Sequence, residues 1–192
     1  MEFDLGKTIE VLERTPSVLR GLLAGIDQAW VSGGYGEGTF TPYDVVGHLI
    51  TGERTDWMVR ARIILDHGTD RPFDKYDRYA HFETSRGKSM GDLLDEFDAA
   101  RGANLAALRA LRLVPADLAK RGRHPALGEV TLANLLATWA VHDLNHLAQI
   151  ARGMAARYED AVGPWRQYLG IYKAAVTKMD GEGEARRRST LT

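Results

Sequence analysis

This 192-residue sequence has no cysteine, almost no net charge, no long apolar run and no apolar amino-terminal segment. Without cysteine the chain has no disulfide, no thiolate metal ligand and no cysteine nucleophile. Its 25 Lys and Arg against 26 Asp and Glu leave a net charge of −1, so we expect no nucleic-acid partner. No apolar run approaches about 18 residues, and the first residues are charged, so we expect a cytoplasmic protein without a membrane partner.

The main pattern in the sequence is a series of apolar residues at helical spacing. The length fits about one domain, which we place at residues 1–178, followed by a disordered tail over 179–192. A first apolar stripe runs through residues 5–26 with spacings of three and four. Thr15-Pro16 interrupts it, so we expect the helix to break there and to restart with Thr15 as its N-cap.

Three more long helices are marked by a hydroxyl residue at the start of an apolar stripe. They are expected to begin after Thr41, Ser89 and Thr131 and to cover about 42–65, 90–111 and 132–150. Gly163-Pro164 opens a shorter helix that we expect to reach about Lys178, whereas residues 115–130 are expected to form a loop. The sequence therefore predicts an all-α protein, an antiparallel four-helix bundle with a short additional C-terminal helix and no strand.

The polar segment 67–88 carries aromatic residues three positions apart. These are Phe73, Tyr76, Tyr79 and Phe82. A short helical turn that packs its rings on the bundle is the simpler interpretation, and a lid over a pocket is the alternative.

The strongest local signal for chemistry is His142-Asp-Leu-Asn-His146. A spacing of four places both imidazoles on one helix face, where their nitrogens can meet one metal ion. The motif is not the zinc-protease signature, because Asp143 replaces its glutamate and should point away from the histidine face. Taken alone, the pair fits two hydrogen-bonded histidines in a packing seam equally well.

His48, on the second expected helix, is the candidate third member. Three imidazoles from two helices of one bundle would form a metal triad with a coordination position left for water or substrate. The other histidines, His67, His81 and His124, lie in expected loops, and we interpret them as surface or loop-packing residues. His124 could instead brace the site.

Polar residues near the triad are candidates for orienting its imidazoles. They are Glu53, Asp56, Asn145 and Gln149. For each of them a solvated or interhelix polar position is the preferred interpretation. The second helix is locally basic because it carries Arg54, Arg60 and Arg62. Such residues are typical of a solvent-exposed face, and attraction of an anionic substrate is the alternative interpretation.

The order of several segments resembles the DinB-like family of metal-binding four-helix-bundle proteins. The similar segments span about residues 5–178 and are Leu12-Glu-Arg-Thr-Pro16, Tyr43-Asp-Val-Val-Gly-His48, Leu127-Gly-Glu-Val-Thr131, His142 to Ile150 and Val162-Gly-Pro-Trp165. The resemblance implies a divalent metal, zinc or nickel, with His48, His142 and His146 as its ligands. It also implies a homodimer, because dimers are common in the family.

Members of that family include thiol-dependent transferases and a mycothiol-dependent maleylpyruvate isomerase. The resemblance thus favours a metal-dependent enzyme that transfers a small thiol to an electrophilic substrate. Because the chain has no cysteine, the sulfur would come from a low-molecular-weight thiol. A metal-dependent hydrolase using metal-bound water and a non-catalytic metal-binding stress-response protein are the alternatives. The near-neutral charge argues against the DNA-repair role that the family's name suggests.

Overall fold

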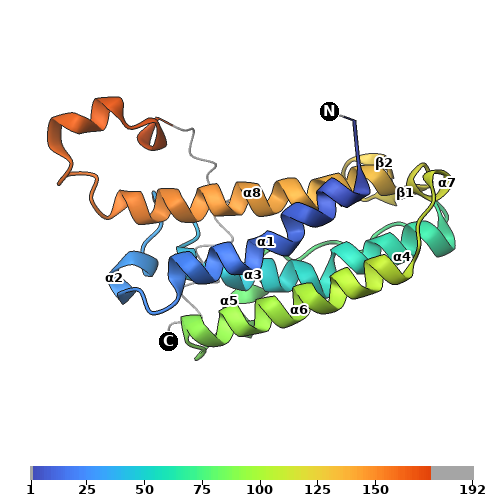
Figure 1. Ribbon diagram of the computed structural model, residues 1–192, viewed down its shortest axis with the longest axis horizontal. Helices are drawn as coiled ribbons and strands as arrows, with labels where there is room; N and C mark the ends of the chain where they lie inside the picture. The colour runs from blue at the N-terminus through green and yellow to red at the C-terminus, as the bar shows by residue number, and fades with distance from the viewer. Residues whose placement is uncertain (1, 174–192) are drawn as a thin grey trace.

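The computed structural model describes residues 2–173 and has four long helical arms (Figure 1). The arms are α1 (Leu5–Leu23), α3 (Pro42–Thr55) continued by α4 (Trp57–His67), α6 (Met90–Ala110) and α8 (Leu132–Ala156). Short helices α2 (Gln28–Val31), α5 (His81–Thr84) and α7 (Pro115–Leu118) lie in the connections. The all-α bundle predicted from the sequence is confirmed, and no helix of the described residues is long and apolar enough to cross a membrane.

The three predicted capping hydroxyls are present, and each forms a capping box that explains where its helix begins. The hydroxyls of Thr41, Ser89 and Thr131 each accept the backbone N–H three residues later. The side chain at that later position accepts the N–H of the capping residue in return, so two backbone donors at each helix start are satisfied.

The direction of the four arms sets where the connections must pass. α1 packs against α6 and α8, and α3 packs against the same two helices. As Figure 1 shows, α1 and α8 run in one direction while α3–α4 and α6 run in the other, so each arm has one parallel and one antiparallel neighbour. Because α4 ends at the opposite end of the bundle from the start of α6, residues 68–89 return along its length; we call this segment the crossover.

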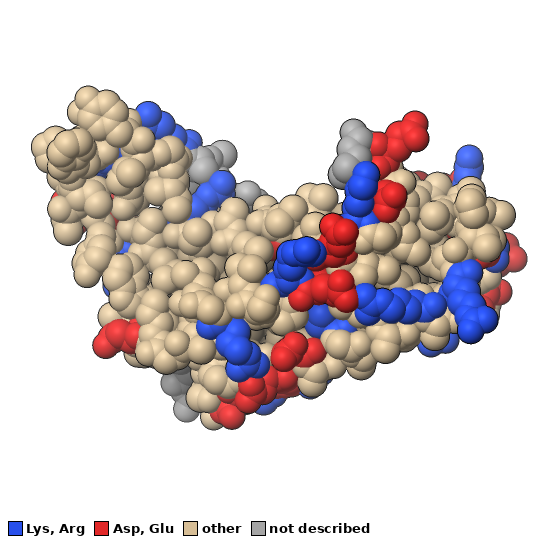
Figure 2. Space-filling model, in the orientation of Figure 1, with Lys and Arg blue, Asp and Glu red and all other residues tan. Residues whose placement is uncertain are grey.

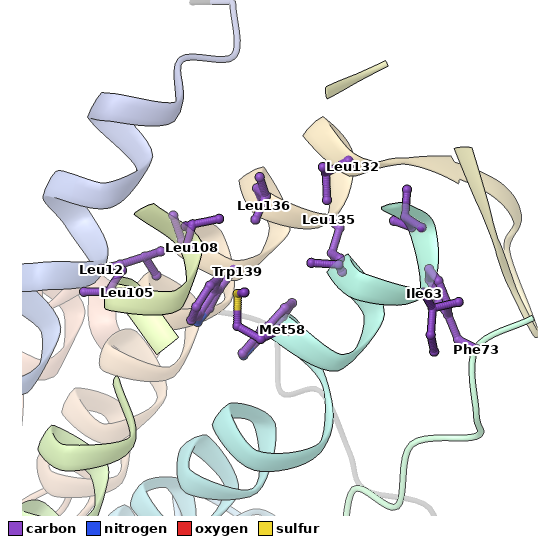
Figure 3. Close-up of a cluster of buried hydrophobic side chains, with 14 residues drawn as sticks. Leu12, Met58, Ile63, Phe73, Leu105, Leu108, Leu132, Leu135, Leu136 and Trp139 are labelled. Carbon is purple, nitrogen blue, oxygen red and sulfur yellow. The ribbon is translucent and has the colours of Figure 1, made fainter. Parts of the chain in front are cut away.

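Two apolar clusters fill the bundle. One surrounds Trp139 and includes Leu136 and Met58 (Figure 3), and the other surrounds Phe97 near the opposite end. The guanidinium of Arg101 lies between them, 4.9 Å from the centre of the Phe97 ring and 5.3 Å from that of Trp139. On the face seen in Figure 2 acidic and basic side chains are interspersed rather than gathered by sign.

The expected break at Thr15-Pro16 is wrong, because α1 continues through Pro16 without interruption. Proline lacks the N–H that would bond the carbonyl of Leu12, four residues earlier. The buried Arg101 supplies the missing donor, with Nη1 2.9 Å from the Leu12 oxygen. The Thr15 hydroxyl donates within the helix instead of capping a new one, and it also contacts Asp143.

The second helix is interrupted where the sequence predicts continuity. Asp56 adopts φ −118° and ψ −78°, which separates α3 from α4, and the second arm ends as expected before Gly68, whose φ is +58°. The interruption turns the Asp56 side chain into the protein, where it pairs with Arg60.

The absence of strands is also wrong. Residues 121–131 form a hairpin in which β1 (Arg121–His124) pairs antiparallel with β2 (Gly128–Thr131). Gly122 is required there, because a Cβ atom would lie 2.6 Å from Ile64 and 3.0 Å from the Phe73 ring.

The predicted fifth helix is replaced, as far as residue 173, by the short 3-10 helices η1 (Gly163–Tyr168) and η2 (Gly170–Tyr172). Its last residues and the predicted disordered tail over 179–192 lie outside the described residues.

Candidate metal centre

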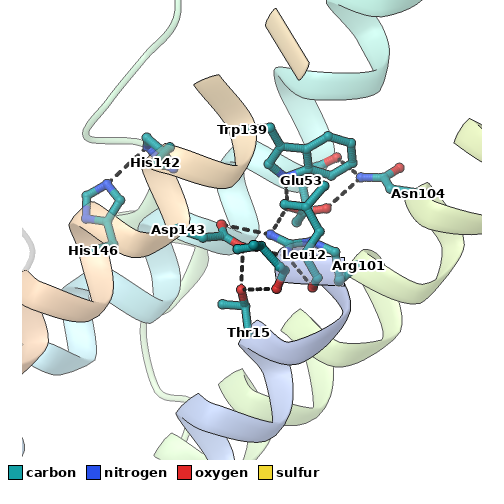
Figure 4. A network of polar contacts seen from close by, with 10 residues as sticks. Leu12, Thr15, Glu53, Arg101, Asn104, Trp139, His142, Asp143 and His146 are labelled. Atoms are coloured by element: carbon teal, nitrogen blue, oxygen red, sulfur yellow. Dashed lines mark hydrogen bonds and ion pairs between the residues drawn. The ribbon is translucent and has the colours of Figure 1, made fainter. Parts of the chain in front are cut away.

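Three histidines from two helices meet inside the bundle. His48 lies in the second turn of α3, and His142 and His146 lie one turn apart on the antiparallel α8. The Nε2 atoms of His142 and His146 are 3.0 Å apart (Figure 4), and the His48 ring centre is 4.8 Å from that of His146. One nitrogen from each of the three lies within 4.8 Å of the others.

The environment of these rings disfavours protonation. Burial lowers the pKa of all three histidines, and their mutual proximity lowers those of His48 and His142 further. The pKa of His142 falls to about 3, with the charge of Arg101 as a smaller cause. Neutral imidazoles whose lone pairs converge are the form that binds a metal.

The spacing of the nitrogens fits a metal ion. Ligands at about 2.0–2.1 Å from a tetrahedral zinc ion are separated by about 3.3 Å, close to the observed Nε2–Nε2 distance of 3.0 Å. Among the described residues no fourth histidine, aspartate or glutamate joins the group.

Two of the three imidazoles have a hydrogen-bonding neighbour at their outer nitrogen. His146 donates from Nδ1 to Gln149 Oε1 at 2.7 Å, which directs its unprotonated Nε2 toward His142. The Tyr76 hydroxyl lies 3.3 Å from His48 Nδ1. The Nδ1 atom of His142 is buried and has no hydrogen-bond partner in the described part of the chain.

Of the four candidate orienting residues, only Gln149 touches a histidine of the triad. Asn145 is exposed, and Asp56 is buried beside Arg60, with its carboxylate 2.6 Å from the Arg60 Nε atom. Burial raises the pKa of Asp56 to about 6, although the Arg60 charge opposes this. The position of Gln149 three residues after His146 was the signal available in the sequence.

Glu53 and Asp143 belong to a separate buried network next to the triad (Figure 4). Arg101 donates to both oxygens of Asp143, at 2.6 and 3.0 Å, and to Glu53 at 2.8 Å. Trp139 and Asn104 also donate to Glu53. Asp143 therefore points away from its histidine neighbours, as predicted, and the network ties the α8 turn between the two histidines to α1, α3 and α6.

The crossover contributes neighbours of His48 that the sequence analysis did not assign to the site. His81, interpreted as a loop-packing residue, is buried, and its ring centre lies 5.7 Å from that of His48. Its Nδ1 donates to the Arg78 carbonyl at 3.1 Å. His124 accepts two backbone N–H groups in the hairpin turn, and His67 is exposed at the end of α4.

The site combines an apolar surrounding with a route to solvent. The Phe40 ring lies 5.5 Å from His48 and the Trp57 ring 5.1 Å from His142. His142 also lines an open groove on the outer side of α8, beside Thr138 and Asn145. Of the triad, His142 is therefore the member that borders this groove.

The cluster of three histidines inside a helical bundle makes this chain a helical protein with a candidate metal site. The DinB superfamily model matches residues 11–150, and the chain belongs to that superfamily.

A protein of Bacillus mycoides (strain KBAB4), provisionally named a metal-dependent hydrolase, is 28% identical over 153 residues, covering 76% of this chain and 83% of that protein. Two solved structures support the fold. YfiT of Bacillus subtilis, described provisionally as a metal-dependent hydrolase with an unusual four-helix-bundle topology, has a TM-score of 0.67 and 24% identity, with coverage of 83% of this chain and 87% of that one. The four-helix bundle protein TT2238 has a TM-score of 0.51 and 23% identity, with coverage of 75% and 95%.

Proposed function

We propose that this chain is a metal-dependent hydrolase of a small-molecule substrate, in which His48, His142 and His146 hold one zinc or nickel ion. The convergence of three neutral imidazole nitrogens without a fourth ligand from the described residues is the observation that supports it. The provisional hydrolase name of the Bacillus mycoides relative agrees with this reaction class.

A divalent ion at this site would supply a Lewis acid that makes a water molecule, or the thiol of a cosubstrate, a stronger nucleophile. The chain's own residues set up the position. Gln149 holds the His146 proton at Nδ1, and the buried Asp143 fixes the helix turn that carries His142 and His146. The rings of Phe40 and Trp57 keep bulk water from the imidazoles.

Transfer of a low-molecular-weight thiol to an electrophile is the second candidate reaction. The observation that favours it is the engagement of Asp143 by Arg101, which removes the nearest carboxylate on α8 as a general base. A thiol needs less help from a base than water does, because its intrinsic pKa is about 8.5.

Elemental analysis of the purified chain, free of an affinity tag, tests the metal site. We expect about one divalent ion per chain, and none after the changes His48→Ala, His142→Ala and His146→Ala are combined. His67→Ala, which replaces an exposed histidine at the end of α4, is the matched control and should retain the ion. Equal metal content in the triple variant and the original chain, with both folded by circular dichroism, would contradict the site.

The metal-loaded protein is then assayed in parallel for hydrolysis of p-nitrophenyl acetate and for transfer of glutathione or cysteine to 1-chloro-2,4-dinitrobenzene. Loss of hydrolysis in the triple variant, with the His67→Ala protein unaffected, is the expected result. Metal-dependent thiol transfer without hydrolysis would favour the second candidate. Metal binding without turnover of either substrate would favour a non-catalytic metal-binding protein.

A further inference from the structure

Tyr76 connects the crossover to the triad by a hydrogen bond. The side chain is half-buried, and its hydroxyl lies 3.3 Å from the Nδ1 atom of His48. The centres of the two rings are 5.7 Å apart, and their planes are inclined at 79°. The contact is therefore made through the hydroxyl and not by stacking of the two rings.

The crossover is fixed to the bundle on both sides of Tyr76. Before it, Phe73 is buried, and its backbone N–H donates to the Arg123 carbonyl of β1 at 2.9 Å. After it, Tyr79 is also buried, in the other of the two apolar clusters. Because the chain is held by contacts outside the triad on both sides, the Tyr76 hydroxyl is placed independently of the imidazole that it contacts.

The proton on a neutral imidazole decides which of its nitrogens can bind a metal ion. One nitrogen carries the proton, so only the other has a lone pair to offer. His146 donates from Nδ1 to Gln149 at 2.7 Å, whereas His142 Nδ1 is buried and has no hydrogen-bond partner within residues 2–173. His48 is thus the second member of the triad with a neighbour that can fix the place of its proton.

We propose that Tyr76 is the positioning residue of His48: its hydroxyl oxygen accepts the Nδ1 proton and thereby leaves Nε2 unprotonated toward the metal ion. The reverse arrangement, in which the hydroxyl donates to Nδ1, would place the proton on Nε2 and block metal binding there. The proposed arrangement gives His48 the same kind of outer partner that Gln149 gives His146. The effect on metal affinity rests on the proposed function, whereas the place of the proton on His48 is a property of the metal-free chain.

Nitrogen NMR of the metal-free, ¹⁵N-labelled full chain measures which nitrogen of His48 carries the proton, with His48→Gln to assign its signals. At about pH 8, above the ordinary histidine pKa, we expect mainly the Nδ1–H tautomer. Tyr76→Phe, which removes only the hydroxyl, should shift His48 toward the Nε2–H tautomer. The matched control is Tyr43→Phe, because the Tyr43 hydroxyl contacts the Ser85 and Lys88 carbonyls of the crossover, at 2.6 and 2.8 Å. This control should leave the tautomer unchanged.

Competition with a chelator then measures the affinity of each protein for zinc. Tyr76→Phe should weaken zinc binding by about tenfold, the lower end of the effect of a lost ligand partner, because its contact is longer than that of Gln149. Tyr43→Phe should leave the zinc affinity within about twofold of the original. Circular dichroism and urea unfolding of the metal-free variants check that neither change acts through a loss of the fold.

A proton on Nε2 of His48 in the original chain would overturn the proposal, as would a Tyr76→Phe protein with an unchanged tautomer or an unchanged zinc affinity. Equal losses of zinc affinity in the Tyr76→Phe and Tyr43→Phe proteins would overturn it as well, because loosening of the crossover would then explain both. If zinc does not bind to the original chain but the tautomer of His48 depends on Tyr76, the metal-dependent function fails while the positioning of His48 by Tyr76 stands.

Discussion

Replacement of Arg101 by methionine tests the network that joins the four arms. Methionine has a similar length but no charge and no donor, so it leaves the carboxylates of Glu53 and Asp143 facing an apolar side chain. It also leaves the Leu12 carbonyl without the donor that replaces the missing N–H of Pro16. Arg101 is 1% exposed, so water cannot substitute for these contacts without opening the core.

Breaking a buried ion pair by removal of one partner costs about 3–5 kcal/mol, because the remaining charge is uncompensated. We therefore expect Arg101→Met to lower the free energy of unfolding by about 3–5 kcal/mol. For a chain of this length that loss corresponds to a Tm lower by about 6–20 °C. Urea unfolding of the metal-free protein at neutral pH, followed by circular dichroism, measures the change.

Arg109→Met is the matched control, because Arg109 also lies on α6 and pairs with Glu13 of α1. Both partners of this pair are about half exposed, so its loss should cost less than about 1 kcal/mol. The reasoning is refuted if Arg101→Met stays within about 1 kcal/mol of the original protein, or if the two variants lose the same amount.

Two further predictions concern the histidines. Gln149→Leu should weaken metal binding by about 10–100-fold in competition with a chelator, because His146 loses the acceptor for its Nδ1 proton. The control Asn145→Leu, on the exposed side of α8, should leave the metal affinity unchanged. Equal metal affinities of the two variants would contradict the role of Gln149. The pKa values of His48, His142 and His146 lie below 6.5 in the fold, so the unfolded chain takes up protons first and the metal-free protein should lose stability as pH falls below about 6.5. Each such histidine lowers the free energy of unfolding by up to about 1.4 kcal/mol per pH unit as the pH falls, until its folded pKa is reached, which is about 3 for His142. Equal free energies of unfolding in urea at about pH 7 and about pH 5 would refute this.

The helix starts could be predicted because their causes are local. Thr41, Ser89 and Thr131 each act on backbone and side-chain groups three residues away, and that distance is visible in the sequence. At the interruption, Asp56 pairs with Arg60, and the Arg60 guanidinium lies 5.2 Å from the centre of the Phe73 ring of the crossover. The sequence does not show that these segments meet in space. The parallel neighbours in the bundle are equally hidden, because helix lengths alone do not tell which way a long connection returns.

In the candidate site, too, the contacts within one helix could be predicted from the sequence, and the contacts between distant segments could not. The pairing of His142 with His146 follows from helical spacing, and the contact of Gln149 with His146 lies one turn further along the same helix. Tyr76 reaches the triad only because the crossover runs back along the bundle, so no local pattern marks it. His48 lies on another helix, so the sequence marks it only as a candidate third member, and the resemblance to a known family points to the same residue.

Pro16 shows why a sound local rule failed, and the failure can be tested. Proline ends a helix because it leaves the carbonyl four residues earlier without a donor, but here Arg101 donates to that carbonyl of Leu12. If this substitution of donors keeps α1 continuous, Pro16→Ala should have little effect in the original protein, where the carbonyl is already bonded. In the Arg101→Met protein the backbone N–H gained at position 16 would bond the orphaned carbonyl, so Pro16→Ala should recover about 1–3 kcal/mol. A double-mutant cycle by urea unfolding measures this coupling, and an equal effect of Pro16→Ala in both backgrounds would show that Arg101 does not replace the missing donor.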